Sequence, residues 1–359
     1  MGAARPFRQA GEMWCLQDSK PVYDPGVESL RIEHDGISLA ASYSPAGETV
    51  IVALHGAGQG TRDYFLYEHL HEVLPPAGIG VVTFDRRGEG ESTGDASRGR
   101  FDVQAKDALA VLEAVDAEGT GLWGISQGGW VAPLAAAASD RVSFLVLVAS
   151  TGVTPSEQMM YATAEQLRRG GYDALVVEHA LDLRRRFEDA VHGRTLDEAE
   201  LKAELWSGLD EPWFPLLFLP PTLLDDEGRR LWIKEMDFDP RPVFAQVRVP
   251  TLLFYGEDDG WTPVGPSIEA WREARWGRSR NRRHRGGDAR ADAPGRHAGP
   301  GVRAQARRLA NRRVVELSRA VRARGEPGDW SRQRPSSSRR PRRTDDRDVS
   351  STPSVRRRL

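Results

Sequence analysis

Five short apolar runs within the first 256 residues constrain the fold more than any other feature of the chain. Each run is nearly continuous in hydrophobicity and rich in β-branched and aromatic residues, which is typical of strands buried on both faces. Segments with helical spacing lie between the runs. Because strands and helices alternate, the sequence predicts an α/β fold with one mostly parallel sheet flanked by helices. The runs are TVIVAL (49–54), IGVVTF (79–84), TGLWGI (120–125), VSFLVLVAS (142–150) and TLLFYG (251–256).

Two segments depart from this alternation and divide the chain into parts. The residues on either side of Asp35-Gly36 alternate apolar with polar, which indicates an antiparallel hairpin. Later, several polar helical patterns surround the aromatic, proline-rich stretch EPWFPLLFLPP, which favours an inserted helical cap. The expected parts are an N-terminal extension (1–27), a first core segment (28–150), a helical cap (151–240), a second core segment (241–275) and a disordered Arg-rich tail (276–359).

The distribution of charge supports the last of these boundaries. The formal net charge is -2, but residues 276–359 hold 25 of the 50 Lys+Arg residues and 8 of the 52 Asp+Glu residues. That segment contains no Lys, Ile, Met, Phe, Tyr or Cys, and its basic residues are all Arg. Such a composition cannot bury a core, so the sequence predicts disorder after about residue 275.

Composition also narrows the class of protein. Cys15 is the single cysteine, so the chain cannot form an internal disulfide. The N-terminus has no apolar run that would serve as a secretory signal, and no segment approaches 18 consecutive apolar residues. We therefore expect a cytoplasmic enzyme without a membrane-spanning helix.

The most specific motif is GISQGG, which lies between an apolar run and an alanine-rich helical segment. It matches G-x-S-x-G, and glycines two residues before and after Ser126 permit a sharp turn that lifts the hydroxyl clear of a sheet. The alternative is a glycine-rich turn with an incidental serine. The strand-to-helix context favours a nucleophile.

A second glycine-rich segment, LHGAGQG, follows the first parallel run. It lacks the lysine of a Walker phosphate loop and does not meet Rossmann spacing. It is better suited to an oxyanion hole built from the backbones of Ala57 and of Gln127, the residue after the nucleophile. His55 is then expected to brace the loop rather than to act as a base.

Carboxylates follow the last apolar run, in the segment GEDDGWTP. A catalytic triad needs one acid at such a strand end to orient a histidine. Asp259 is the first choice and Asp258 the second, and at least two of the three acids, which include Glu257, are expected to be solvated loop residues.

In this order, LHGAGQG, DRRGEGES, GISQGG and GEDDGWTPV resemble the α/β-hydrolase superfamily, in particular its cap-bearing serine esterases and related acyl hydrolases. The resemblance covers residues 28–275. It implies that Ser126 is the nucleophile, that Asp259 is the triad acid, and that the backbones of Ala57 and Gln127 form the oxyanion hole. We expect DRRGEGES to be a structural turn with internal salt bridges.

The family pattern next requires another strand, a loop with the catalytic histidine and a closing helix, and the sequence departs from it here. The histidines after Asp259 are His284 and His297, both in Arg-rich surroundings without an apolar run before them. Both are weak candidates, because solvated tail histidines are the more ordinary interpretation. The catalytic base is therefore unassigned.

Codon degeneracy offers an explanation for the missing histidine. GC-rich DNA read out of frame yields chains rich in Arg, Ala, Gly and Pro. A shift of one nucleotide through residues 282–290 permits Val-Val-Ile-Glu-Gly-Gly-Thr-His-Glu, a strand followed by a histidine loop. We hypothesise that the reading frame slips between Ala274 and Asn281. The competing hypothesis is an Arg-rich arm that binds nucleic acid. The acidic charge of residues 1–275 and the presence of only two aromatic residues in the tail argue against this hypothesis.

The predicted function is hydrolysis of a small-molecule carboxylic ester or thioester through an acyl-enzyme on Ser126. For lack of the histidine, we expect little activity from the chain as written. No metal or organic cofactor is expected, because no His, Cys or Asp cluster has metal-ligand spacing. The alternatives are an acyltransferase, a peptidase, or a non-catalytic binding protein with a nucleic-acid-binding tail. Four aromatic cap residues suit either an apolar substrate or core packing, namely Trp206, Trp213, Phe214 and Phe218.

Overall fold

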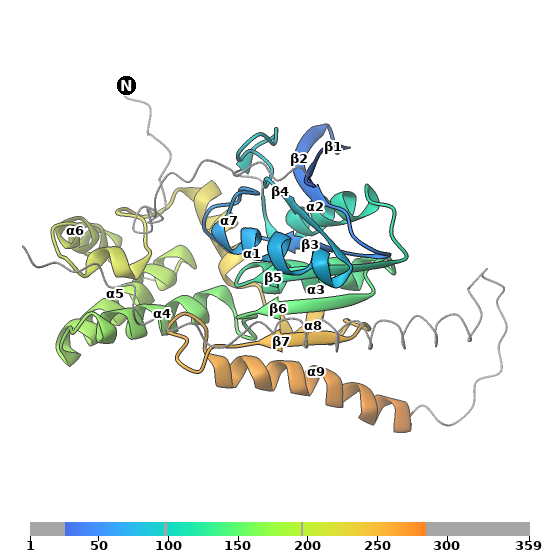
Figure 1. The fold of residues 1–359 in the computed structure, drawn as a ribbon. Helices are drawn as coiled ribbons and strands as arrows, with labels where there is room; N and C mark the ends of the chain where they lie inside the picture. The colour runs from blue at the N-terminus through green and yellow to red at the C-terminus, as the bar shows by residue number, and fades with distance from the viewer. Residues whose placement is uncertain (1–25, 97–98, 195–196, 285–359) are drawn as a thin grey trace, which may run out of the picture.

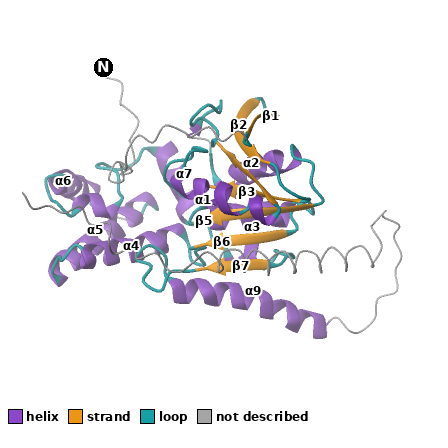
Figure 2. Ribbon diagram, viewed as in Figure 1, coloured by secondary structure: helices purple, strands orange, loops and turns teal. Residues whose placement is uncertain are grey.

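The computed structural model describes residues 26–96, 99–194 and 197–284, and a single mixed sheet forms its centre (Figures 1 and 2). Within these residues the strand order across the sheet is β1-β2-β4-β3-β5-β6-β7. β3 pairs in parallel with β4 and β5, and parallel pairing continues through β6 to β7. The strands are β1 (Glu28–His34), β2 (Ile37–Ser44), β3 (Thr49–Leu54), β4 (Ile79–Phe84), β5 (Gly119–Ile125), β6 (Phe144–Val148) and β7 (Thr251–Phe254).

The predicted strands are confirmed, with small differences at their ends. Every residue of β3 and β4 is buried, as expected for strands covered on both faces. The apolar run 142–150 is a strand only as far as Val148, because Ala149 has a φ of 51° and turns the chain out of the sheet. The predicted hairpin is β1 and β2, and β2 continues the sheet by pairing antiparallel with β4.

Helices cover both faces of the sheet. Val50, Val52 and Leu54 of β3 pack into the core formed with α2, α3, α8 and α9. Ile51 and Ala53, which point the other way, pack with α1. The period of two along the strand therefore assigns each helix to a face. The core helices are α1 (Phe65–Val73), α2 (Phe101–Glu113), α3 (Gly128–Ala138), α8 (Arg241–Phe244) and α9 (Val264–His284), and a 3-10 turn, η2 (Pro75–Ala77), follows α1.

Four further helices and a 3-10 turn lie between β6 and α8 and extend away from the carboxyl ends of the strands (Figure 1). They have an apolar core of their own, which includes Leu167, Phe187, Leu205 and Phe214. A capping box between Thr154 and Glu157 begins the first of them. The elements are α4 (Pro155–Arg169), α5 (Ala174–Val191), α6 (Glu198–Gly208), η4 (Phe214–Leu217) and α7 (Asp226–Met236).

The C-terminal end of the described chain differs from expectation in one respect. Helix α9 continues past residue 275, where we placed the start of the tail, and ends at His284. β7 is the last strand of the sheet among the described residues, and all of its residues are partly exposed. The predicted extension before residue 26 and the tail beyond His284, with His297, lie outside the described residues.

Candidate active site

Ser126 lies at the carboxyl end of β5, immediately before α3. Its φ is 51°, a left-handed conformation that a residue with a Cβ rarely adopts. This conformation costs about 1–2 kcal/mol and persists only where the surroundings enforce it. The Ser126 N–H donates to Val148 O at 2.9 Å, and its carbonyl accepts from Gly129 N at 2.8 Å. The side chain is partly exposed. The turn therefore places a partly exposed serine at the carboxyl end of the parallel strands.

The glycines of GISQGG are required by the close packing of this turn. A Cβ on Gly124 would lie 2.4 Å from Gly128 O, and one on Gly128 would lie 2.9 Å from Leu54 O. A Cβ on Gly129 would lie 2.7 Å from the Cα of Ser150. All three obstacles are backbone atoms, which cannot rotate aside. The three glycines of the motif are therefore required because backbone atoms lie too close to each of them for a Cβ to fit.

The LHGAGQG loop lies beside Ser126. A Cβ built on Gly56 would be 3.7 Å from the Cβ of Ser126, so the backbone of the loop passes close to the serine. Ala57 is exposed and Gln127 is buried at the start of α3. The structure thus places Gly56, the neighbour of Ala57, close to Ser126. The N–H groups of Ala57 and Gln127 have no hydrogen-bond partner among the described residues.

His55 is buried and in contact with aromatic rings. Its ring makes edge contacts with Tyr67 and Phe84. Burial lowers the pKa of His55 to about 3, with a further contribution from the charge of Arg86. A histidine that stays neutral through the physiological range and lies inside the core is a poor proton acceptor for Ser126. These contacts are those of a brace for the loop.

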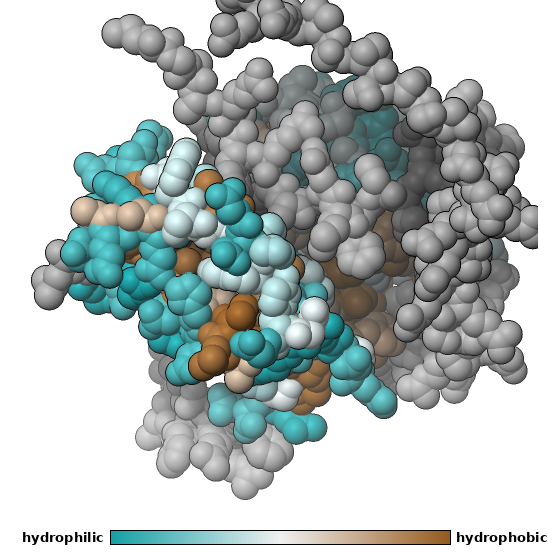
Figure 3. Space-filling view, turned by 90° about the vertical axis from the view of Figure 1, so that its left-hand side faces the viewer, coloured by the Kyte–Doolittle hydropathy of each residue, from teal (hydrophilic) through white to brown (hydrophobic). Residues whose placement is uncertain are grey.

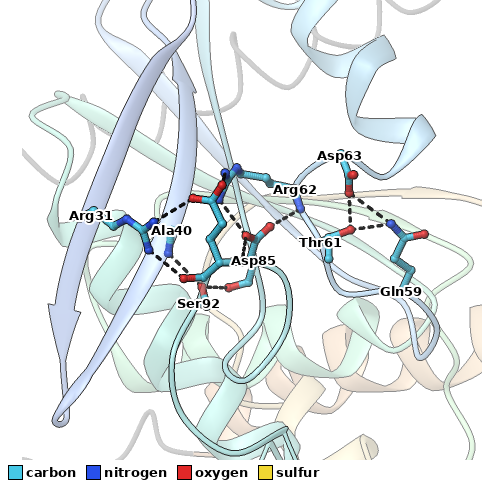
Figure 4. Close-up of polar contacts among 9 residues, drawn as sticks. Arg31, Ala40, Gln59, Thr61, Arg62, Asp63, Asp85 and Ser92 are labelled. Carbon is cyan, nitrogen blue, oxygen red and sulfur yellow. Dashed lines mark hydrogen bonds and ion pairs between the residues drawn. The ribbon is translucent and has the colours of Figure 1, made fainter. Parts of the chain in front are cut away.

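The DRRGEGES turn is held by charges, and several of these reach other segments. Asp85 accepts hydrogen bonds from Arg62 N at 2.7 Å, Arg62 Nη1 at 2.8 Å and Glu91 N at 2.8 Å (Figure 4). Ser92 Oγ donates to Asp85 O and accepts from Ala40 N of β2. Among the described residues one of the internal ion pairs that we expected is present, between Arg86 and Glu89. The other ion pairs of the turn reach outside it, and the turn ties β2 to the segment after LHGAGQG.

Arg86 and Glu89 of this turn form hydrogen bonds with the LHGAGQG loop, which the sequence did not predict. Arg86 Nη2 donates to Gly56 O at 2.6 Å, and Arg86 N donates to Gly60 O at 2.6 Å. Glu89 Oε2 accepts from Gly60 N at 2.9 Å. His55 Nε2 and Arg86 Nε have no hydrogen-bond partner among the described residues, and both residues line a cavity of about 10 Å³ behind the loop.

The three carboxylates after β7 have different surroundings. Asp259 Oδ1 accepts hydrogen bonds from Trp261 N and Thr262 N, both at 2.8 Å, which fixes its side chain on the loop. Asp258 is exposed and forms an ion pair with Arg169 of α4 at 2.6 Å. Glu257 is exposed. Only Asp259 is held by backbone donors, which favours it over Asp258 for orienting another side chain.

Ser126 and Asp259 lie at the same edge of the sheet, with β6 between their strands. Ile125 pairs with Val148, and Val148 pairs with Phe254, so the ends of β5 and β7 are level. Two strand spacings correspond to about 10 Å. This is the distance between the ends of the two strands, and no hydrogen bond among the described residues joins the side chains of Ser126 and Asp259.

The acid loop is also the place where the cap contacts the core. Tyr161 Oη donates to Asp259 O at 2.8 Å, and Gln166 Nε2 donates to Gly260 O at 3.2 Å. The rings of Phe218 and Trp261 lie 5.3 Å apart. An aromatic pair therefore joins the cap to the loop that carries Asp259.

The other aromatic cap residues lie elsewhere. Trp213 and Phe214 are buried in the cap core, so packing accounts for them. Trp206 is 70% exposed on α6. Figure 3 views this end of the molecule and shows hydrophobic side chains in small groups among hydrophilic ones. Of the four aromatic residues singled out in the sequence, Phe218 alone contacts the acid loop.

The structure leaves the catalytic base unassigned. Helix α9 begins after the acid loop and runs 21 residues to His284 (Figure 1). At 1.5 Å per residue, the two ends of this helix are about 30 Å apart. The described residues contain no group of three or more His, Cys, Asp or Glu that could hold a metal ion. In the same residues, no helix combines the length and hydrophobicity needed to cross a bilayer.

Comparison with known proteins gives consistent results. A family model described as alpha/beta hydrolase fold matches residues 49–287. A 2-hydroxy-6-oxononadienedioate/2-hydroxy-6-oxononatrienedioate hydrolase from Dechloromonas aromatica is 26% identical over 67% of this chain and 81% of its own length. The dihydrolipoyllysine-residue acetyltransferase component of the acetoin cleaving system from Pseudomonas putida is 30% identical over 62% of this chain and 56% of its own. Among solved structures, an esterase from Pyrococcus furiosus aligns with a TM-score of 0.47 and 15% identity, covering 70% of this chain and 78% of that one.

Proposed function

Because the chain belongs to the α/β-hydrolase family, we propose that Ser126 is the nucleophile of a serine hydrolase that cleaves a carboxylic ester or thioester through an acyl-enzyme. The observation that carries this proposal is the left-handed φ of 51° at Ser126. Strain at a half-exposed polar residue, enforced by three glycine contacts, is typical of a functional position. No described hydrogen bond of the Ser126 hydroxyl accounts for this strained conformation, whereas a role as nucleophile does.

The chemistry follows from the groups around Ser126. A base removes the hydroxyl proton as Oγ attacks the substrate carbonyl, and the resulting oxyanion accepts hydrogen bonds from the N–H groups of Ala57 and Gln127. Collapse expels the alcohol or thiol and leaves an acyl group on Ser126, which water then removes. Asp259 is proposed to orient and stabilise the base through the carboxylate oxygen that its loop leaves free.

The base is the part of this machinery that remains unassigned among the described residues. We propose that the frame slip hypothesised above removed it, and that the chain retains only residual activity. In subtilisin, loss of the histidine alone lowers turnover roughly a million-fold. Sequencing the gene across codons 270–290 tests the slip directly, and an unaltered frame through the Arg-rich stretch would exclude it.

The names of the curated relatives support a second substrate class. The relative from Dechloromonas aromatica is named for hydrolysis of a 2-hydroxy-6-oxo dienedioate, a dicarboxylate that carries a ketone. Attack of Ser126 on a ketone carbonyl would use the same oxyanion donors. The carbon–carbon bond beside that carbonyl would then break, the departing carbon fragment would take up a proton, and water would remove the acyl group from Ser126. A screen that sets aryl esters, acyl thioesters and a 2-hydroxy-6-oxo dienoate side by side separates the two classes, with Ser126→Ala as the blank.

Labelling by a fluorophosphonate tests the nucleophile. We expect slow labelling at Ser126 in the present chain, none in Ser126→Ala, and fast labelling in a frame-corrected chain. Intact-mass spectrometry followed by peptide mapping locates the adduct. Fast labelling of the present chain that depends on His284 or His297 would show that the tail supplies a base. Labelling that persists in Ser126→Ala would overturn the proposal.

A further inference from the structure

Arg86 lies behind the LHGAGQG loop with its guanidinium against the loop's carbonyl groups. Nη2 donates to Gly56 O at 2.6 Å and approaches Gly58 O at 3.5 Å. Nη1 forms an ion pair with Glu89 Oε1 at 3.2 Å, and the side chain is 11% exposed. Burial lowers the pKa of Arg86 from its usual range, although the charge of Glu89 opposes this effect. An arginine remains protonated under such conditions, so a buried cation faces the loop.

The carbonyl that Arg86 holds belongs to a particular peptide unit. Gly56 O and the Ala57 N–H are parts of one planar group, and in a trans peptide they point in opposite directions. A hydrogen bond that fixes the oxygen therefore also fixes the direction of the N–H. A Cβ built on Gly56 would be 3.7 Å from the Cβ of Ser126, so this N–H belongs to the part of the loop that lies beside the serine.

We propose that Arg86 is a positioning residue that aims the Ala57 N–H at the oxyanion site. The inference rests on the function proposed for Ser126. Ala57 and its neighbours Gly58 and Gln59 are exposed, so few packing contacts restrain the loop. Glu89 holds Gly60 N, which fixes the far end of the loop. Arg86 holds the end next to Ser126.

The charge of Arg86 has a second effect on the same peptide. A cation hydrogen-bonded to a carbonyl draws electron density toward the oxygen and makes the attached N–H a stronger donor. The effect reaches the oxyanion through one peptide unit, without contact between Arg86 and the substrate. Lysine would retain the charge without the planar fork that spans Gly56 O and Glu89, so it should restore part of the effect.

A spectroscopic experiment on the full chain measures the orientation of this peptide independently of activity. With carbonyl-13C glycine and 15N alanine, an HNCO spectrum contains signals only from Gly–Ala pairs, and the sequence has two, Gly2–Ala3 and Gly56–Ala57. We expect Arg86→Met to shift the Gly56–Ala57 signal in both the carbonyl and amide dimensions. Arg86→Lys should give an intermediate shift, and the Gly2–Ala3 signal should not move.

Arg62→Met is the matched control, because it also removes a partly buried guanidinium from the same network. Arg62 pairs with Asp85 and Glu91, and its side chain makes no described hydrogen bond to residues 56–60. We expect this variant to leave the Gly56–Ala57 signal in place. If Arg86→Met does not fold, as judged by circular dichroism, Arg86→Lys and Arg86→Gln provide the same comparison.

The rate at which a fluorophosphonate labels Ser126 links the peptide to reactivity. Loss of a whole oxyanion donor costs roughly 100-fold to 1,000-fold, so a misdirected donor should slow labelling by about tenfold or more in Arg86→Met. Arg62→Met should label at the wild-type rate. An unmoved Gly56–Ala57 signal, or wild-type labelling in Arg86→Met, would overturn the proposal while the nucleophile stands. If neither wild type nor the frame-corrected chain labels while the signal moves, the proposed function fails and the positional effect of Arg86 remains.

Discussion

Replacing Gly124 with alanine should disrupt the turn that carries Ser126. The new Cβ would lie 2.4 Å from Gly128 O, about 1 Å inside the 3.4 Å at which ordinary contact begins. Overpacking costs about 1–3 kcal/mol, and the upper end applies here because the obstacle is the backbone of the turn rather than a flexible side chain. We expect a loss of about 3 kcal/mol, which lowers Tm by about 6–12 °C for a domain of this size.

Gly265→Ala is the control for the same chemical change. A Cβ at this position has no heavy atom within 4 Å, and the residue is in the first turn of α9. Helix propensity should therefore raise stability by up to about 1 kcal/mol. Thermal and urea unfolding followed by circular dichroism measure both variants, and fluorophosphonate labelling reports on the serine. A Gly124→Ala protein within about 0.5 kcal/mol of wild type, with unchanged labelling, would refute the close-packed turn, because shifts of that size are typical of uninvolved surface sites.

Three smaller perturbations test other parts of the structure. Asp107→Asn leaves Arg87 buried without its carboxylate and should cost about 3–5 kcal/mol in urea unfolding; wild-type stability would mean that the pair is solvated. Asp237 raises the pKa of His192. This pair therefore stabilises the fold below the unfolded pKa of about 6.5, and the stabilisation is lost as pH rises through the folded pKa. Free energies of unfolding measured across that pH range should show this loss in wild type and not in His192→Gln. Thr154→Ala removes the capping box of α4 and should lower stability by about 1 kcal/mol, whereas no change in Tm would show that the cap is redundant.

The sequence was sufficient to predict the centre of the sheet because β3 and β4 are buried on both faces. A run such as 49–54 has one physical explanation, since residues 50–54 of β3 pack on both faces of the sheet, between α1 and α2, and are all apolar. The turn at Ser126 was equally accessible, because backbone crowding leaves glycine as the only residue that fits at 124 and 128. Burial of a strand and crowding at a turn both leave a signal within a few consecutive residues, so they can be predicted from the sequence.

Contacts between distant segments were not accessible in the same way. Arg86 was expected to take part in salt bridges within its own turn, and it does pair with Glu89. Its bond to Gly56 O joins residues 30 positions apart and depends on how β3 and β4 lie side by side. The same holds for Asp259, where Tyr161 from the cap reaches the loop across 98 positions. No pattern in either segment signals such a partner.

The position of β7 connects the fold to the missing base. Leu252 and Phe254 face the side of the sheet that carries α1, and both remain partly exposed. An apolar edge strand in this state invites pairing with another strand. The shifted frame hypothesised above would encode Val-Val-Ile followed by a histidine, and such a strand paired with β7 would end at the same edge as Ser126 and Asp259. One added strand would therefore cover the exposed edge, and the loop after it would carry a histidine to the edge of the sheet at which Ser126 and Asp259 lie. The exposed edge and the unassigned base would then share one explanation.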